Sequence, residues 1–227
     1  SPRAVKSAEA KSINVNDGRT TATDLVGNGE TVFRGESGLT FLKNNVVPDA
    51  TNQVGASQLT KVGGDGEGTP LEMPIVEGKA TGSYTGGSIS LTVAEPRITD
   101  FDGLTNTTAN NGVDVAGATL LQSNEDAEVS VDYNFAGADD VQLTVEEAGG
   151  LDVTNEIVDS TNPNTSTSGT VTFDLDPQNV ATGTYTFTVE GADDLDFGDA
   201  TQSTTVTIAD DESAAIALES ASVIQGE

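Results

Sequence analysis

Four carboxylates late in the chain have the residue type and spacing for cation chemistry. Asp193, Asp194, Asp196 and Asp199 lie between two segments in which apolar and polar residues alternate. Calcium is held by several carboxylate and carbonyl oxygens, so this group is a candidate calcium site. No bidentate Glu follows at the offset of an EF-hand loop, so the alternative of a solvated acidic turn stays open.

Two smaller acidic groups flank this half of the chain. Asp100 and Asp102 precede it, and Asp210 and Asp211 follow it. Cations that bridge carboxylates at such borders would stiffen a row of domains, and we include all four residues in the candidate metal set. Acidic surface charge without any metal is the alternative for each residue.

Enzymatic chemistry has little support. The chain has no His and no Cys, which removes the common acid–base and nucleophile arrangements. Paired carboxylates can hydrolyse glycosides, but a chain without Trp and with three Tyr has few residues for a sugar cleft. A Ser/Lys nucleophile would need one of the lysines, none of which lies in a recognisable motif: Lys6, Lys11, Lys43, Lys61 and Lys79. We therefore predict that the protein is not an enzyme.

Two Asn-X-Ser/Thr motifs predict N-linked glycans. They begin at Asn106 and at Asn164, both in polar segments expected to be loops. Short motifs also occur by chance, so two unmodified asparagines are the alternative.

The charge is distributed unevenly. The chain carries 9 Lys+Arg and 37 Asp+Glu, for a net charge of −28. Arg97 is the last basic residue, and residues 98–227 carry 26 acidic side chains. A domain without basic residues cannot neutralise phosphates, which argues against nucleic acid and anionic lipid as partners.

Such a charge destabilises a compact state in dilute buffer, while at molar salt the Debye length falls to roughly 3 Å and the repulsion is screened. Disorder is the alternative, but the regular alternation of apolar residues argues against it. We expect a folded protein from a hypersaline setting that loses structure when salt is removed.

Strand patterns recur at regular spacing in the acidic half. Six segments predict strands: 117–122, 127–135, 140–147, 169–175, 183–190 and 201–209. A helical turn is expected at 153–158 and a polar loop at 160–168. We predict an all-β protein of tandem immunoglobulin-like β-sandwich domains, although the Cys and Trp marks of antibody domains are missing.

The first 95 residues give a weaker pattern. Short strands are expected at 31–34, 39–42, 57–62, 73–76 and 88–93, with residues 82–87 as a connection. Pro96 and the change in charge at Arg97 predict a border. The expected division is 1–95, a first β-rich domain; 96–212, an immunoglobulin-like domain; and 213–227, the start of a third.

No apolar run approaches the ~20 residues of a membrane helix. The chain begins with Ser1, so for an exported protein we expect that the signal has been removed and that any anchor lies beyond Glu227.

Several motifs resemble the amino-terminal part of haloarchaeal surface-layer glycoproteins. They run from Pro96 to Asp100, Val131 to Asn134, Leu143 to Glu146, Asp152 to Glu156 and, most specifically, Glu190 to Thr201. The segment from Gly29 to Glu36 resembles the opening of the mature chain in that family.

The resemblance implies a secreted, N-glycosylated protein of several immunoglobulin-like domains. Copies would assemble with one another into a porous two-dimensional lattice, the surface layer of the cell wall, supported by divalent cations. Membrane attachment would use a carboxy-terminal anchor outside this segment. The family's glycans map only onto Asn106 and Asn164 here.

A calcium-dependent adhesin or a carbohydrate-binding module on the cell surface is the alternative function. Scarce aromatic residues count against stacking on sugars, while tandem domains suit both functions. A surface receptor for a virus or a mating partner is compatible with either.

Overall fold

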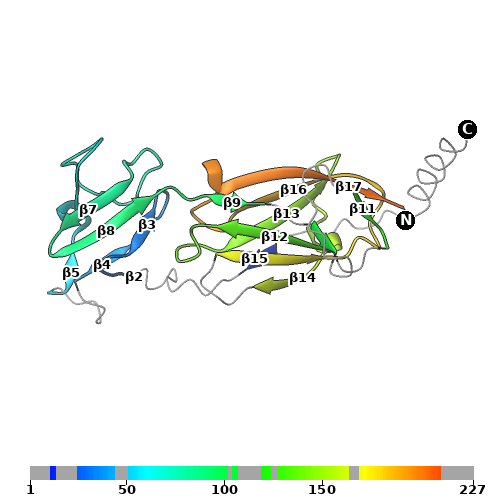
Figure 1. Ribbon diagram of the computed structural model, residues 1–227, viewed down its shortest axis with the longest axis horizontal. Coiled ribbons are helices and arrows are strands. Elements are labelled where there is room, and N and C mark those ends of the chain that lie inside the picture. Colours follow the sequence, from blue (N-terminus) through cyan, green and yellow to red (C-terminus); the bar gives the residue numbers. More distant parts are fainter. Residues whose placement is uncertain are drawn as a thin grey trace, which may run out of the picture.

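The computed structural model describes residues 11–13, 25–43, 51–101, 104–106, 119–123, 127–163 and 169–210 (Figure 1). The all-β class is confirmed, and the immunoglobulin-like topology within it stays a prediction. The strands are β1 Lys11–Ile13, β2 Leu25–Val26, β3 Thr31–Phe33, β4 Thr40–Leu42, β5 Gln53–Val54, β6 Thr60–Lys61, β7 Gly82–Gly86, β8 Ile89–Ala94, β9 Ile98–Asp100, β10 Leu104–Asn106, β11 Thr119–Leu121, β12 Ala127–Tyr133, β13 Val141–Glu147, β14 Val158–Pro163, β15 Thr170–Leu175, β16 Gly183–Gly191 and β17 Thr201–Ala209.

Helical structure in these residues is limited to single turns. The α-helix α1 spans Thr154–Ile157, where the sequence predicts one helical turn, and the 3-10 helices η1 and η2 span Ala56–Gln58 and Gly198–Ala200. No helix in the described part of the chain has the length and apolar character of a membrane span.

We call residues 96–210 the second unit. Its two sheets have the strand orders β1-β13-β16-β17-β11 and β10-β12-β15-β14, and β9 also pairs with β12. Pairing is antiparallel except between β11 and β17. Buried residues of both sheets form one hydrophobic cluster.

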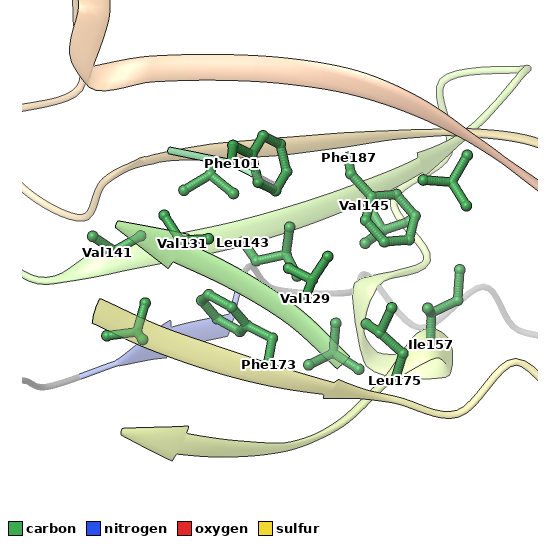
Figure 2. Packing of buried hydrophobic residues seen from close by; sticks show 14 of the residues in the cluster. Phe101, Val129, Val131, Val141, Leu143, Val145, Ile157, Phe173, Leu175 and Phe187 are labelled. Atoms are coloured by element: carbon green, nitrogen blue, oxygen red, sulfur yellow. The ribbon is translucent and has the colours of Figure 1, made fainter. Parts of the chain in front are cut away.

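Strict alternation of residues explains this cluster. Along β12 and β16 every second side chain is buried, because successive side chains of a strand point to opposite faces. Figure 2 shows the result, with Val129, Phe173 and Phe187 pointing into the space between the sheets. The intervening residues are mostly Thr, Ser, Asp and Glu and lie on the outer faces.

We call residues 25–95 the first unit. Its strands are shorter and form a sheet of order β2-β4-β5 and another of order β3-β8-β7-β6. A second hydrophobic cluster, which includes Phe41 and Tyr84, fills this unit. Gly86 of β7 lies so close to Gln58 that a Cβ there would be 1.7 Å from the Gln58 carbonyl oxygen, so only glycine fits.

All six strands expected in the second unit are present within a few residues of their predicted ends. Several expectations are wrong. Of the expected strand 57–62 only Thr60–Lys61 is a strand, because residues 57 and 58 belong to the 3-10 helix η1. Residues 73–76 form no strand, because Pro74 lacks an N–H and Ile75 bonds instead to the turn at Gly35 and Glu36. Residues 82–86 are strand β7 rather than a connection. Part of the expected loop 160–168 belongs to edge strand β14, where Pro163 is tolerated at the sheet margin.

The two clusters lie on either side of the expected border at residues 95 and 96, with one exception. Phe33, from β3 of the first unit, belongs to the cluster of the second unit. Strand β1, from the amino-terminal segment, pairs with β13 of the second unit. The division at residue 95 stays a prediction, and residues 213–227 lie outside the described residues.

Candidate functional site: the joint between the two units

The acidic turn, residues 191–200, connects β16 to β17 at the end of the second unit that meets the first unit. Its side chains point to two different sides. Leu195 and Ala200 are buried in the hydrophobic cluster, and Phe197 packs against it. All four aspartates are exposed. The turn therefore combines an apolar inner side with a carboxylate-covered outer side.

A buried carboxylate from another loop fixes the shape of the acidic turn. Asp139 is only 7% exposed, and its Oδ2 accepts hydrogen bonds from the backbone N–H groups of Asp193 and Leu195, at 3.1 Å each. Its Oδ1 accepts from the N–H of Asp140 at 2.8 Å. Gly191 must remain small, since a Cβ there would lie 2.1 Å from the Leu195 carbonyl oxygen.

The buried environment of Asp139 shifts the pKa of its carboxyl group. Burial raises the pKa of Asp139 to about 6, because removal from water disfavours the ionised form. The three backbone donors act in the opposite direction and offset part of the increase, while the nearby negative charge of Asp193 adds to it. The residue that positions the acidic turn thus titrates close to neutral pH.

A turn of the first unit packs against the acidic turn. Gly35 approaches so closely that a Cβ there would lie 2.5 Å from Cε1 of Phe197 and 3.0 Å from the carbonyl oxygen of Asp194. The Ser37 hydroxyl donates a hydrogen bond of 2.8 Å to Asp194 Oδ2. We call residues 34–37 the docking turn.

The residue before the docking turn anchors it. Phe33 is 4% exposed and makes an edge contact with Phe135, with ring centroids 6.4 Å apart. Phe135 is in turn in edge contact with Tyr133 at 4.9 Å. An aromatic side chain of the first unit therefore packs inside the second unit, and burial of a large ring is among the strongest stabilising contributions available.

The docking turn is held just as firmly by its own unit. The Glu36 side chain is buried, and its Oε2 accepts from the Phe33 N–H at 2.6 Å. Ile75 completes the turn: its carbonyl accepts from the Gly35 N–H at 2.6 Å, and its N–H donates to the Glu36 carbonyl at 2.9 Å. These contacts connect the joint to the core of the first unit.

The chain that crosses between the units is also fixed. Asn134 accepts from the Arg97 N–H at 2.8 Å and donates to the Glu95 carbonyl at 3.0 Å through its side chain. Its backbone N–H donates to the Arg97 carbonyl at 3.1 Å. Pro96 between them is buried. The connection from β8 to β9 (Figure 1) is therefore held by hydrogen bonds on both sides of a buried proline, which restricts its backbone conformations.

The last two arginines of the chain place positive charge at this joint. Arg34 and Arg97 both approach Glu95, at 3.9 and 3.2 Å, and Arg97 also approaches Asp199 of the acidic turn at 3.8 Å. Arg97 is 54% exposed, so each of its ion pairs contributes little alone. Together they offset part of the negative charge where the units meet.

The predicted metal ligands are distributed differently from what a single calcium site requires. Within the described part of the chain, no three carboxylates gather in a way that could hold a metal ion. Asp100 ends β9 opposite Asp132, Asp210 directly follows β17, and Asp102 and Asp211 lie outside the described residues. Calcium at these residues stays a prediction that requires oxygen ligands from elsewhere.

The two glycosylation motifs have different positions. Asn106 is the last residue of strand β10, which lies at the margin of its sheet, rather than in the expected loop. Asn164 follows β14 and lies outside the described residues. Glycosylation at both residues stays a prediction.

Comparison with known proteins gives the relationships of the chain. No family model matches it. Three curated relatives are named "Cell surface glycoprotein": one from Halobacterium salinarum, 40% identical over 92% of this chain, one from Haloarcula japonica, 39% identical over 93%, and one from Haloarcula marismortui, 40% identical over 89%. The chain is homologous to haloarchaeal cell surface glycoproteins.

This homology confirms the resemblance drawn from the motifs at Pro96 and Glu190. It covers about nine-tenths of the chain, whereas the chain spans about a quarter of the length of these cell surface glycoproteins. Their shared name describes no enzyme.

The residues that build the joint are not among the functional residues predicted from sequence. Asp139 lies between the expected strands 127–135 and 140–147 and is not among the predicted metal ligands, and the predicted border places Phe33 and Gly35 in the first domain alone. The signal for Gly35 was present, since Arg34-Gly-Glu36 directly follows a strand and indicates a tight turn. Nothing in the local sequence distinguishes the buried Asp139 from the half-buried Asp140 beside it.

Proposed function

We propose that the chain is the amino-terminal part of a structural cell-wall protein, a surface-layer glycoprotein that self-assembles on the surface of a halophilic archaeal cell. The observation that carries the proposal is about 40% identity to haloarchaeal cell surface glycoproteins over nine-tenths of the chain. The stiff joint supports a mechanical role, since a lattice subunit must hold its domains at a fixed angle.

In this proposal divalent cations support the lattice. The aspartates of the acidic turn lie on the surface and do not form a site alone, so two copies that meet there would together supply enough oxygens. N-linked glycans at Asn106 and Asn164 belong to the same proposal. Mass spectrometry of peptides from the native protein would test them, with Asn106→Gln and Asn164→Gln as separate variants.

Electron microscopy of the full-length native protein in molar NaCl tests the proposal. Ordered sheets should form with calcium and dissolve with chelator. Circular dichroism should show that the dispersed protein is still folded. Dispersed monomers under both conditions would overturn the wall function and favour the adhesin alternative.

A further inference from the structure

The outer face of the sheet β13-β16-β17-β11 has an unusual composition. Its residues follow from the strand register, since residues paired across neighbouring strands share a face: Gln142, Thr144 and Glu146 on β13, Thr184, Thr186, Thr188 and Glu190 on β16, Thr201, Ser203, Thr205, Thr207 and Ala209 on β17, and Thr119 and Leu121 on β11. We call this set the hydroxyl face. Nine of its fourteen side chains are Thr or Ser, and only Glu146 and Glu190 are charged. The hydroxyl of Thr201 is buried, which leaves eight for the surface.

The rest of the second unit is different. The outer face of the opposite sheet carries a carboxylate at three of its six positions on β12 and β15: Glu128, Ser130, Asp132, Thr170, Thr172 and Asp174. The acidic turn exposes four more carboxylates. Because no basic residue follows Arg97, two copies that meet through most of this unit bring negative charges together.

Hydrogen-bond chemistry points to the same face. An ionised carboxylate only accepts hydrogen bonds, so two carboxylate-rich surfaces cannot bond to each other. A hydroxyl both donates and accepts, so a hydroxyl surface is complementary to a second copy of itself. Thr188 and Ser203 already show the geometry within one copy, with their hydroxyl oxygens 2.8 Å apart.

We propose that the hydroxyl face is a contact surface for the same face of a second copy of this chain. The contact costs little side-chain entropy, because β-branched Thr has few rotamers to lose. Desolvating hydroxyls that find new hydrogen-bond partners is also far less costly than desolvating carboxylates.

The size of the face fits a weak, repeated contact. Strands β16 and β17 have nine residues each, which gives a length of about 30 Å, and the four strands of the face give a width of about 19 Å. Two such faces bury roughly 1,000 Å² in total, at the lower end of specific interfaces. Contacts of this size become effective when many copies are linked, as in a lattice. The choice of a second copy of the chain as the partner that binds the hydroxyl face rests on the proposed function.

The test places charge at the centre of the face. Thr186 and Thr205 are paired neighbours on β16 and β17, and Thr186→Glu with Thr205→Glu would set carboxylates against those of the second copy. The control is Thr172→Glu with Ser130→Glu, a paired position on the opposite face. Each variant is made in the full-length protein in molar NaCl, and circular dichroism checks its fold.

Sheet formation is followed by electron microscopy, and dimerisation of dispersed protein by sedimentation. The face variant should raise the concentration needed for self-association about tenfold or more, with the control close to wild type. Sheets or dimers that form equally well with the face variant would overturn the inference and leave the wall function intact. Dimers without sheets, sensitive only to the face variant, would support the inference and reject the wall function. No self-association of the wild type in either form would overturn both.

Discussion

The two units build their hydrophobic cores from different kinds of β-strand. The second unit builds its core from strands of up to nine residues with strict alternation, and the first from strands of two to six residues joined by irregular loops. The joint takes one element from each unit: a tight turn from the irregular unit and an acidic turn from the regular one. The first unit therefore contributes the docking turn, and the second unit contributes the surface against which that turn packs.

Substitution of Phe33 should have the largest effect on how the two units are held together, since this residue comes from the first unit and packs in the second. Phe33→Ala should cost about 3 to 5 kcal/mol of unfolding free energy, as for other large buried rings. We expect thermal unfolding to separate into two transitions because the units lose their shared anchor. Phe41→Ala is the matched control: Phe41 is equally buried but belongs to the first cluster, so the variant should destabilise the first unit alone. A single unchanged transition in Phe33→Ala would contradict this.

Gly35 tests directly whether the two units are in contact, because its small size matters only if they touch. Gly35 and Gly29 both have left-handed backbone, with φ of +99° and +87°, but a Cβ at Gly29 would meet nothing within 4 Å. Left-handed strain costs about 1–2 kcal/mol at either residue. Gly35→Ala should cost about 1–3 kcal/mol more, from the clash with Phe197. Equal losses in the two variants, measured by denaturant unfolding in molar NaCl, would mean that the units do not pack at this point.

Asp139 makes the joint sensitive to pH. Because its folded pKa of about 6 is above the ordinary value of 3.8, the folded state binds a proton that the unfolded state releases. This contribution to stability is fully present below pH 3.8 and is lost as the pH rises through about 6. The difference amounts to about 2–3 kcal/mol across this window.

Asp139→Asn removes that titration and keeps the shape of the side chain. The unfolding free energy of the wild type minus that of the variant should fall between pH 4 and pH 7. Asp196→Asn serves as control, because Asp196 is an exposed residue of the same turn that does not contribute to the pKa shift of Asp139, and this variant should leave the pH dependence of the wild type in place. A wild-type curve parallel to that of Asp139→Asn would contradict the assignment.

The smallest expected effect concerns charge at the joint. Arg97→Gln should change stability by less than about 1 kcal/mol, and by less still at molar salt, because its ion pairs are exposed and screened. Lys43→Gln, an exposed residue far from the acidic turn in sequence, gives the baseline. A loss above 2 kcal/mol at molar salt would show that the ion pairs rather than the packing hold the units together.

Strands are predictable from sequence where one face of a long strand is buried. The alternation in β12, β15 and β16 predicts both the strands and their buried residues. The shorter or marginal strands β9, β10 and β14 of the same unit lack such a pattern and could not be predicted. In the first unit, strands such as β2 and β5 have two residues each, too few for any period to show. Their pairing depends on tertiary contacts that no local pattern reports.

The candidate site was predictable only in part, for a related reason. Acidity indicated the turn at residues 193–199 correctly as a feature of the surface. It could not show that Leu195 and Phe197 point inward, that Asp139 holds the turn from behind, or that Gly35 packs against it. These are relations between residues far apart in the chain, and an exposed aspartate has the same sequence signal as a buried one.

A distance measurement between the units tests the stiff joint most directly. The chain has no Cys, so Ser83→Cys and Ser203→Cys, both at exposed positions, allow one spin label on each unit. Double electron–electron resonance in molar NaCl should give one narrow distance distribution, which becomes broad in Gly35→Ala. A broad or multiple distribution in the otherwise unaltered protein would show that the units move independently, and the account of the joint would be wrong.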